Sequence, residues 1–309
     1  MHAFVLAAIT VHFLKLPEHA TIDPFGSRPL MGVSSGGNVS AVVTIRGYLT
    51  RRVVWRGDRP VIVRMDPPIL DELRRRCENF PQSTVGPVLA GTLSDGSVIA
   101  TMQSPAIVDL DDTSGQDAPV VLHLRSEQCL NMGNGFAFET AGMYTAGYIA
   151  YINNVPAPSN VVSQNERFVA MRWHDRTREP LGNGVALAVN AAGNAAGADV
   201  PPGKGAAFDV APHARIWIGA SAAAEPANAA NSSVAYAIDD RNRVVGMVED
   251  GAGRHYAFVW ENGTLRRLDD VARAPGWRFE CAYAFTPDGS IVGIGTYRGN
   301  AAAFTIDGL

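Results

Sequence analysis

The chain has little cysteine and no excess of positive charge. Its 309 residues include only Cys77, Cys129 and Cys281, and no two of them form a C-x-x-C pair. This spacing argues against a structural zinc site and a disulfide framework, so we interpret the cysteines as reduced thiols. The net charge of −4 reflects 26 Lys and Arg against 30 Asp and Glu. Because a nucleic-acid-binding surface normally needs a basic stripe, no nucleic-acid partner is expected.

Long hydrophobic runs and the common catalytic motifs are also missing. The most apolar stretch, Ala3–Leu14, is too short to cross a bilayer, and no Lys or Arg precedes it as in a signal peptide. We therefore expect a cytoplasmic protein without a membrane partner, with secretion as the alternative. Walker, G-x-S-x-G, dinucleotide-binding and H-E-x-x-H motifs do not occur. The sequence thus predicts no cofactor and no metal.

What the sequence does contain is a repeat of roughly fifty residues. Its clearest copy, Val234–Leu268, has four short apolar runs separated by Asp, Asn and Gly, which are turn residues. Apolar runs of about five residues are typical of strands and too short for helices. Further copies give units that start near residues 29, 88, 136, 185, 234 and 281.

Four strands in each repeat predict an all-β fold, a six-bladed β-propeller with four-stranded blades that spans residues 1–309 as a single domain. The last unit lacks a fourth strand, and Val11–Leu16 resembles the fourth strand Gly263–Leu268 of the fifth unit. We therefore predict that residues 2–16 form the outer strand of the last blade. Pairing the two ends of the chain would close the ring and remove an open sheet edge.

The strongest copy has a family-like signature. Between Ala235 and Leu268 the sequence reads A-x-A-I-x-D-x-x-x-V-V-G and then A-F-x-W-x-x-G-x-x-x-x-L. This pattern resembles the HAF repeat, a propeller-type repeat named for its His-Ala-Phe strand, and weaker copies cover nearly the whole chain. The resemblance implies a propeller and proteins often called extracellular, but it implies no reaction and no catalytic residues.

Glu139 is the candidate catalytic residue. It occupies a first-strand position at which the other repeats have Ala or Gly, so we expect it near the central channel and partly buried. Burial raises the pKa of a carboxyl, which suits a general acid or base near neutral pH. The alternative is a structural hydrogen bond or salt bridge.

Candidate binding residues come from one face of the predicted propeller. Long loops join second to third strands and join successive blades on that face, and such loops usually carry function. Two equivalent tyrosines on neighbouring inner strands could also line a pocket, although blade packing is the alternative for them, as solvated charge is for the loop residues. The predicted ligand-binding residues are Arg28, Tyr236, Trp277, Glu280, Tyr283, Tyr297 and Arg298.

Two classes of function follow from this reading. The first, which we favour, is a small-molecule enzyme or binder with its site at the channel mouth, in secondary metabolism and with lyase, hydrolase or condensation chemistry. It rests on Glu139, on the aromatic residues and on fold-level analogy. The second is a protein-interaction platform without catalytic activity, which would present a broad exposed apolar patch.

Overall fold

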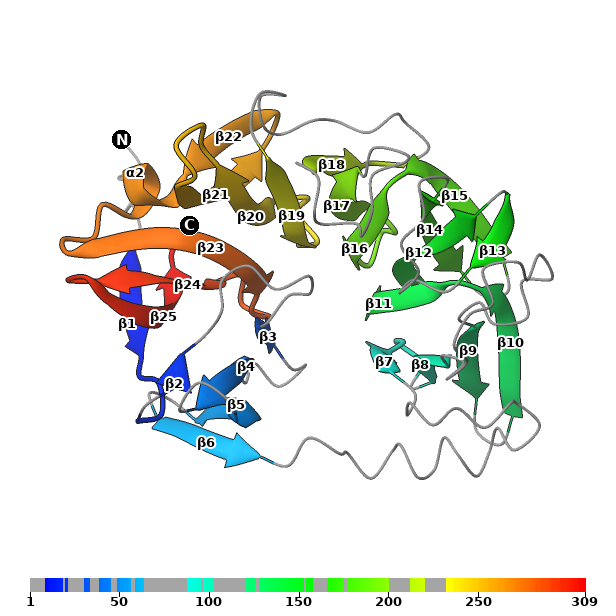
Figure 1. Ribbon diagram of the computed structural model, residues 1–309, viewed down its shortest axis with the longest axis horizontal. Helices are drawn as coiled ribbons and strands as arrows, with labels where there is room; N and C mark the ends of the chain where they lie inside the picture. Colours follow the sequence, from blue (N-terminus) through cyan, green and yellow to red (C-terminus); the bar gives the residue numbers. More distant parts are fainter. Residues whose placement is uncertain are drawn as a thin grey trace, which may run out of the picture. The chain divides into compact units, whose positions relative to one another are not determined.

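The protein is represented by a computed structural model. It describes residues 9–18, 20–21, 31–33, 39–45, 49–56, 59–63, 88–95, 97–102, 120–125, 128–152, 154–157, 166–174, 177–199, 212–219 and 232–309. Strands dominate these segments, so the prediction of an all-β fold is confirmed (Figure 1). The chain divides into two compact units. Unit 1 comprises Met1–Met65 and Arg243–Leu309, and unit 2 comprises Asp66–Asn242.

The strands of the described residues form six sheets. In unit 1, one sheet has the order β1-β25-β24-β23 and another has the order β2-β4-β5-β6, with β3 paired to β4. The strands of these two sheets are β1 (Thr10–Leu14), β2 (Ala20–Thr21), β3 (Met31–Val33), β4 (Val39–Ile45), β5 (Leu49–Arg56), β6 (Arg59–Val63), β23 (Trp277–Phe285), β24 (Ile291–Tyr297) and β25 (Asn300–Asp307).

Unit 2 contains sheets of order β10-β9-β8-β7, β11-β12-β14-β15 with β13 paired to β12, and β16-β17-β18. Their strands are β7 (Val88–Thr92), β8 (Val98–Met102), β9 (Val120–Arg125), β10 (Gln128–Asn134), β11 (Phe136–Ala141), β12 (Tyr144–Ile152), β13 (Val155–Ala157), β14 (Glu166–His174), β15 (Thr177–Asn183), β16 (Val185–Val189), β17 (Ala195–Asp199) and β18 (His213–Trp217).

The sixth sheet has the order β19-β20-β21-β22, and the boundary of the two units falls in its first turn. A short helix, α2, follows it directly and precedes β23. These elements are β19 (Ser233–Ile238), β20 (Val244–Glu249), β21 (His255–Glu261), β22 (Thr264–Arg267) and α2 (Leu268–Ala272).

A bulge recurs in the first strand of four of the sheets. In β7, β11, β16 and β23, the pairing with the second strand skips Ala90, Phe138, Leu187 and Tyr283, respectively, and β23 has a second skip at Glu280. The first four of these residues are equivalent positions in the sequence repeat. A bulge places two residues opposite one and bends the strand. The repeat therefore encodes a local backbone geometry as well as an apolar pattern.

The glycine of the repeat signature is explained by this bulge. Gly147, Gly197 and Gly293 lie on the second strands, opposite the residue before the bulge. A Cβ at these positions would lie 1.9 Å from the Phe136 oxygen, 1.9 Å from the Val185 oxygen and 2.2 Å from the Cys281 oxygen. The backbones approach so closely that a side chain does not fit without a shift of the strand.

The N-terminal strand joins the last sheet, as predicted. Strand β1 pairs antiparallel with β25, from Thr10 opposite Asp307 to Leu14 opposite Ala303 (Figure 1). His12 Nε2 and Asp307 Oδ2 lie 2.8 Å apart across this pair. The predicted strand covered residues 2–16, and of these the structure describes residues 9–16, with the strand itself at Thr10–Leu14.

Candidate functional site

Three aromatic rings meet at one end of the last sheet in unit 1. Trp277 on β23 is paired with Tyr297 on β24, and their ring centroids lie 5.2 Å apart. Phe13 on β1 lies 6.0 Å from each of these rings. Phe13 is 46% exposed, and Trp277 and Tyr297 are partly exposed. We call Phe13, Trp277 and Tyr297 the ring cluster.

Two buried aromatic residues pack against the ring cluster. Phe279 and Phe304 are buried, and the Trp277 ring stacks on Phe279 at 5.5 Å with an interplanar angle of 9°. Gly293 leaves the space for this packing, because a Cβ there would lie 2.5 Å from Phe304 Cζ. The rings are thus fixed by a packed base, and a ligand that stacks on them would not have to order them first.

Arg298 lies beside the ring cluster in an unusual backbone conformation. Its φ is 50°, in the left-handed region, and its guanidinium carbon lies 5.1 Å from the centre of the Tyr297 ring. Its N–H donates to the Gly276 oxygen at 2.7 Å, which ties the β24–β25 turn to the start of β23. Gly, Asn or Asp normally occupies such a position. Arginine is disfavoured in this backbone conformation, so its presence indicates that its side chain has a role.

Three of the predicted binding residues have other roles in this structure. The Glu280 carboxylate forms an ion pair with Arg278 at 2.8 Å. Tyr283, the bulged residue of β23, is 2% exposed. In unit 2, the equivalent Tyr236 is 4% exposed. Both tyrosines belong to the packed interior of their units, which agrees with the alternative of blade packing. Arg28 lies outside the described residues.

Glu139 lies on β11 in unit 2, next to the bulged residue Phe138. The residue is exposed, and desolvation raises the pKa of its carboxyl from 4.5 to about 8. A carboxyl whose pKa lies near neutral pH can exchange a proton with a bound molecule. The position that sequence reasoning selected has this property.

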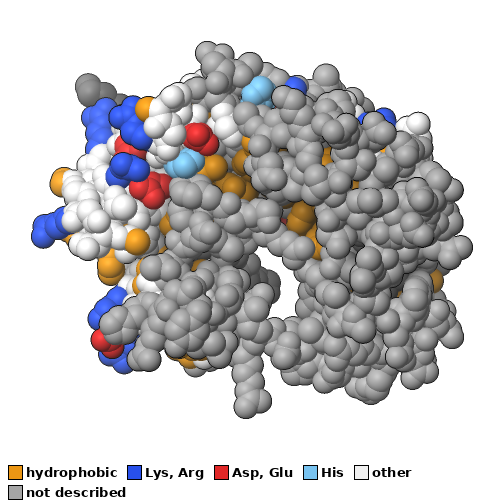
Figure 2. Space-filling view, in the orientation of Figure 1, with side chains coloured by type: hydrophobic (Ala, Val, Ile, Leu, Met, Phe, Trp, Pro, Cys, Tyr) orange, Lys and Arg blue, Asp and Glu red, His pale blue; other side chains and the backbone are white. Residues whose placement is uncertain are grey.

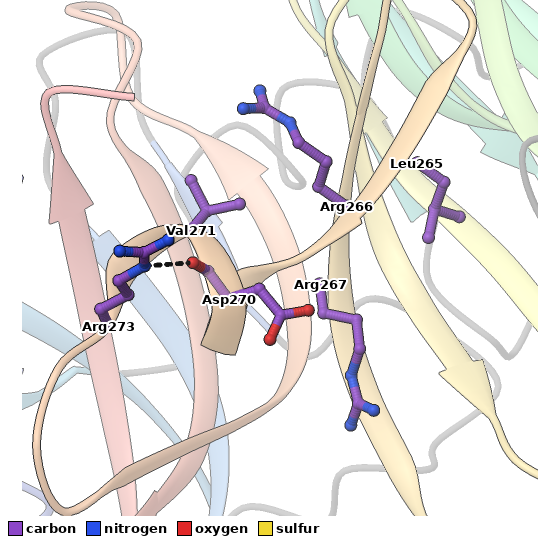
Figure 3. A pocket seen from close by; sticks show the side chains of 6 residues that line it. All are labelled: Leu265, Arg266, Arg267, Asp270, Val271 and Arg273. Atoms are coloured by element: carbon purple, nitrogen blue, oxygen red, sulfur yellow. Dashed lines mark hydrogen bonds between the residues drawn. The ribbon is translucent and has the colours of Figure 1, made fainter.

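An arginine-rich pocket was not predicted from the sequence. It is an open depression of about 610 Å³ between β22 and α2 in unit 1. Figure 3 shows its lining, with Asp270 between Arg273 and Arg267. In Figure 2, basic and acidic side chains gather on the surface around α2. The pocket residues are Leu265, Arg266, Arg267, Asp270, Val271 and Arg273. The tandem Arg266-Arg267 next to a helix was the available signal.

Searches for metal and membrane features gave no candidates in the described part of the chain. No group of three or more His, Cys, Asp or Glu side chains there could hold a metal ion. No helix among the same residues is long and apolar enough to span a bilayer.

The interpretation of the cysteines needs one correction. Cys129 is disulfide-bonded, so it is not a reduced thiol as we predicted. Cys281 is free and fully buried, and burial raises the pKa of its thiol. The cysteines therefore give no support to a cytoplasmic location, because disulfides persist mainly in oxidising compartments.

No family model matches the chain, and no curated protein is similar to it in sequence. Solved structures resemble it in fold. The β-propeller domain of the Trilobed protease from Pyrococcus furiosus, described with an open velcro topology, is 10% identical with a TM-score of 0.50, over 94% of this chain and 82% of that one.

Two other solved structures are more distant. Pyrococcus horikoshii acylaminoacyl peptidase is 12% identical with a TM-score of 0.48, over 95% of this chain but only 44% of the peptidase. A fucose-complexed lectin from Aleuria aurantia is 12% identical with a TM-score of 0.35, over 88% of this chain and 92% of the lectin. At these identities, the likeness to the Trilobed protease domain supports a β-propeller fold and carries no function.

Proposed function

We propose that the protein is a small-molecule binder whose ligand stacks on the ring cluster and pairs with Arg298. The observation that carries this proposal is the combination of three partly exposed rings on a packed base with an arginine in a left-handed conformation. Exposed aromatic faces accept planar or ring-shaped groups, and a guanidinium beside them accepts an anionic group. The expected ligand is therefore a ring-bearing molecule with a negative charge.

The architecture proposed with this function is a six-bladed propeller of HAF-type repeats, closed by β1 in the last blade. Six sheets, four equivalent bulges and the β1–β25 pair support it. An experimental structure with a different number of blades would overturn this part of the proposal.

The binding proposal is tested with single substitutions and a ligand screen. Anionic ring compounds are screened by calorimetry against the wild-type protein, and the best binder is then measured with W277A and R298N. Loss of a stacked ring or of a charge-assisted hydrogen bond costs about 1–3 kcal/mol, so affinity should fall roughly 5- to 150-fold. Arg254→Asn is the control, because Arg254 is exposed and paired with Asp250. Equal losses in the control and in R298N would refute the proposal.

A catalytic function at Glu139 is a second candidate, favoured by the raised pKa of an accessible carboxyl. Its chemistry would be general acid or base catalysis of lyase, hydrolase or condensation type. Any activity found in a substrate screen should be lost in E139Q, and its pH profile should have an inflection near 8. An activity that E139Q retains would exclude the role.

Two further expectations remain open to experiment. A protein-interaction platform would yield a specific partner in pull-downs from the native cell, and F13A should weaken that capture, since Phe13 is an exposed large apolar side chain. The disulfide at Cys129 favours the secreted alternative over the cytoplasm, and fractionation of native cells would decide between them.

A further inference from the structure

The pocket between β22 and α2 is distinct from the ring cluster and has its own chemistry. Three of its six lining side chains are arginines and one is an aspartate. Its volume of about 610 Å³ lies within the range of small-molecule sites. Leu265 and Val271 add apolar surface, which suits the organic part of a ligand.

The nearby carboxylates only partly neutralise the arginines. Arg266 Nη2 lies 3.2 Å from Glu261 Oε2, in a pair in which both side chains are well exposed. The Arg267 guanidinium carbon lies 4.1 Å from the centre of the Tyr256 ring, which holds that group in place through its face. The six lining residues themselves include three arginines against one aspartate, so the lining carries a net positive charge.

Arg273 provides an observation that does not depend on the pocket itself. It ends α2 with φ 46° and ψ 39°, a left-handed cap at which glycine is the usual residue. Among the described residues, five positions other than glycine have positive φ, and three of these are the tolerant asparagines Asn154, Asn242 and Asn262. The other two are Arg273 and Arg298. Strain retained under a large cationic side chain indicates that the side chain is needed.

The Arg273 side chain is also oriented toward the pocket by a backbone contact. Its Nε donates to the Asp270 oxygen at 3.2 Å (Figure 3). Its N–H donates to the Asp269 oxygen at 3.2 Å. In the part of the chain that the structure describes, its terminal amino groups have no carboxylate partner. These amino groups are the paired donors that match two oxygens of a carboxylate or phosphate.

We propose that this pocket binds an organic molecule that carries an oxyanion, either a phosphate or a carboxylate group. Arg273 holds the oxyanion, and Leu265 and Val271 contact the organic part. Guanidinium groups recognise both kinds of oxyanion by the same bidentate geometry. Such a ligand would bind independently of the molecule proposed for the ring cluster.

The test uses two probes and two matched variants. Pyrophosphate and citrate are titrated into the protein at an ionic strength of about 0.15 M, at which the Debye length is about 8 Å, with binding followed by calorimetry and by the arginine side-chain NMR signals. Binding of one probe over the other identifies the oxyanion, and binding of either supports the proposal. In R273N the affinity should fall at least tenfold, while the melting temperature stays the same or rises, because asparagine tolerates a left-handed backbone.

The control is R254N, which removes the same charge from an exposed arginine outside the pocket. It should bind both probes within about twofold of the wild-type protein, because Coulombic effects at a distance are screened. The absence of binding of both probes to the wild-type protein would overturn the proposal. An equal loss of affinity in R273N and R254N would also overturn it, since binding would then depend on net charge alone.

Discussion

Arg243 offers a direct test of how the turns of unit 1 are held. This arginine is 3% exposed and lies directly before the first residue of β20. Its Nη1 donates to the Leu309 oxygen at 2.6 Å and its Nη2 donates to the Gly289 oxygen at 2.8 Å. The guanidinium carbon also lies 5.0 Å from the centre of the Phe285 ring. One buried cation is thus hydrogen-bonded to two segments that lie 46 and 66 residues further along the chain.

The substitution R243M removes these hydrogen bonds and keeps an unbranched apolar side chain. Each hydrogen bond from a charged donor contributes about 1.5–3 kcal/mol, and the oxygens left behind lose a partner. Relief from burying a charge offsets part of this loss. We therefore expect the free energy of unfolding to fall by roughly 2–4 kcal/mol, which corresponds to a decrease in melting temperature of about 4–16 °C for a unit of this size.

Calorimetry and amide hydrogen exchange measure the effect. R243M should lower the melting temperature and speed exchange at the Thr286–Ser290 turn, in which Gly289 N–H donates to the Thr286 oxygen at 2.8 Å. R243K should be intermediate, because a single ammonium cannot match both oxygens as the fork does. R254M is the control, since an exposed ion pair contributes only about 0–1 kcal/mol. A melting temperature for R243M equal to that of R254M would refute the reasoning.

Other substitutions test further parts of the structure. Because the pKa of Glu139 is raised to about 8, its ionised form is disfavoured in the folded protein, so the free energy of unfolding should fall as the pH rises from about 4.5 to about 8. E139Q should abolish this fall, and a pH profile of E139Q parallel to that of the wild type would contradict the prediction. The Cys281 thiol should react with a thiol reagent only after denaturation, and fast labelling of the native protein would show that it is accessible. G293V should destabilise unit 1 by several kcal/mol, because even a Cβ meets the Cys281 oxygen and the Phe304 ring, and a melting curve like that of the wild type would contradict the close approach. R298N should melt at the same temperature as the wild type or higher, and a clear decrease would show that Arg298 is structural.

The parts of the fold that repeat could be predicted from the sequence, since each copy confirms the others. The turn residues and apolar runs gave the strands, and the missing fourth strand in the last copy pointed to the β1–β25 pair. The glycine of the signature was visible, but its cause was not. The cause is the short distance between the strands at the bulge, which brings the Phe136 oxygen close to Gly147. This distance can be measured only in the three-dimensional structure.

The candidate sites could be predicted only in part, because they depend on side-chain direction. Trp277, Tyr297 and Arg298 were selected from their loops and do come together. Tyr236 and Tyr283 were selected as pocket residues but are buried, so they belong to the packed interior. Phe13 was missed because its contacts with Trp277 and Tyr297 join opposite ends of the chain.

Residues of the arginine pocket were missed for a different reason. Charged side chains in a turn are usually solvated, so Arg266 and Arg267 carried no specific signal. The informative feature was Arg273, an arginine at the end of a short helix where glycine is usual. That feature becomes visible only when the backbone angles are known.

Pairing of β1 with β25 also determines when the ring cluster can exist. The contact between His12 and Asp307 spans 295 residues, so β1 leaves the ribosome long before β25 has been made. Until then Phe13 lies on an unpaired edge strand, which is the kind of surface that promotes aggregation. Assembly of the ring cluster is therefore a late event, and a ligand that needs Phe13 would recognise only chains whose synthesis has reached β25.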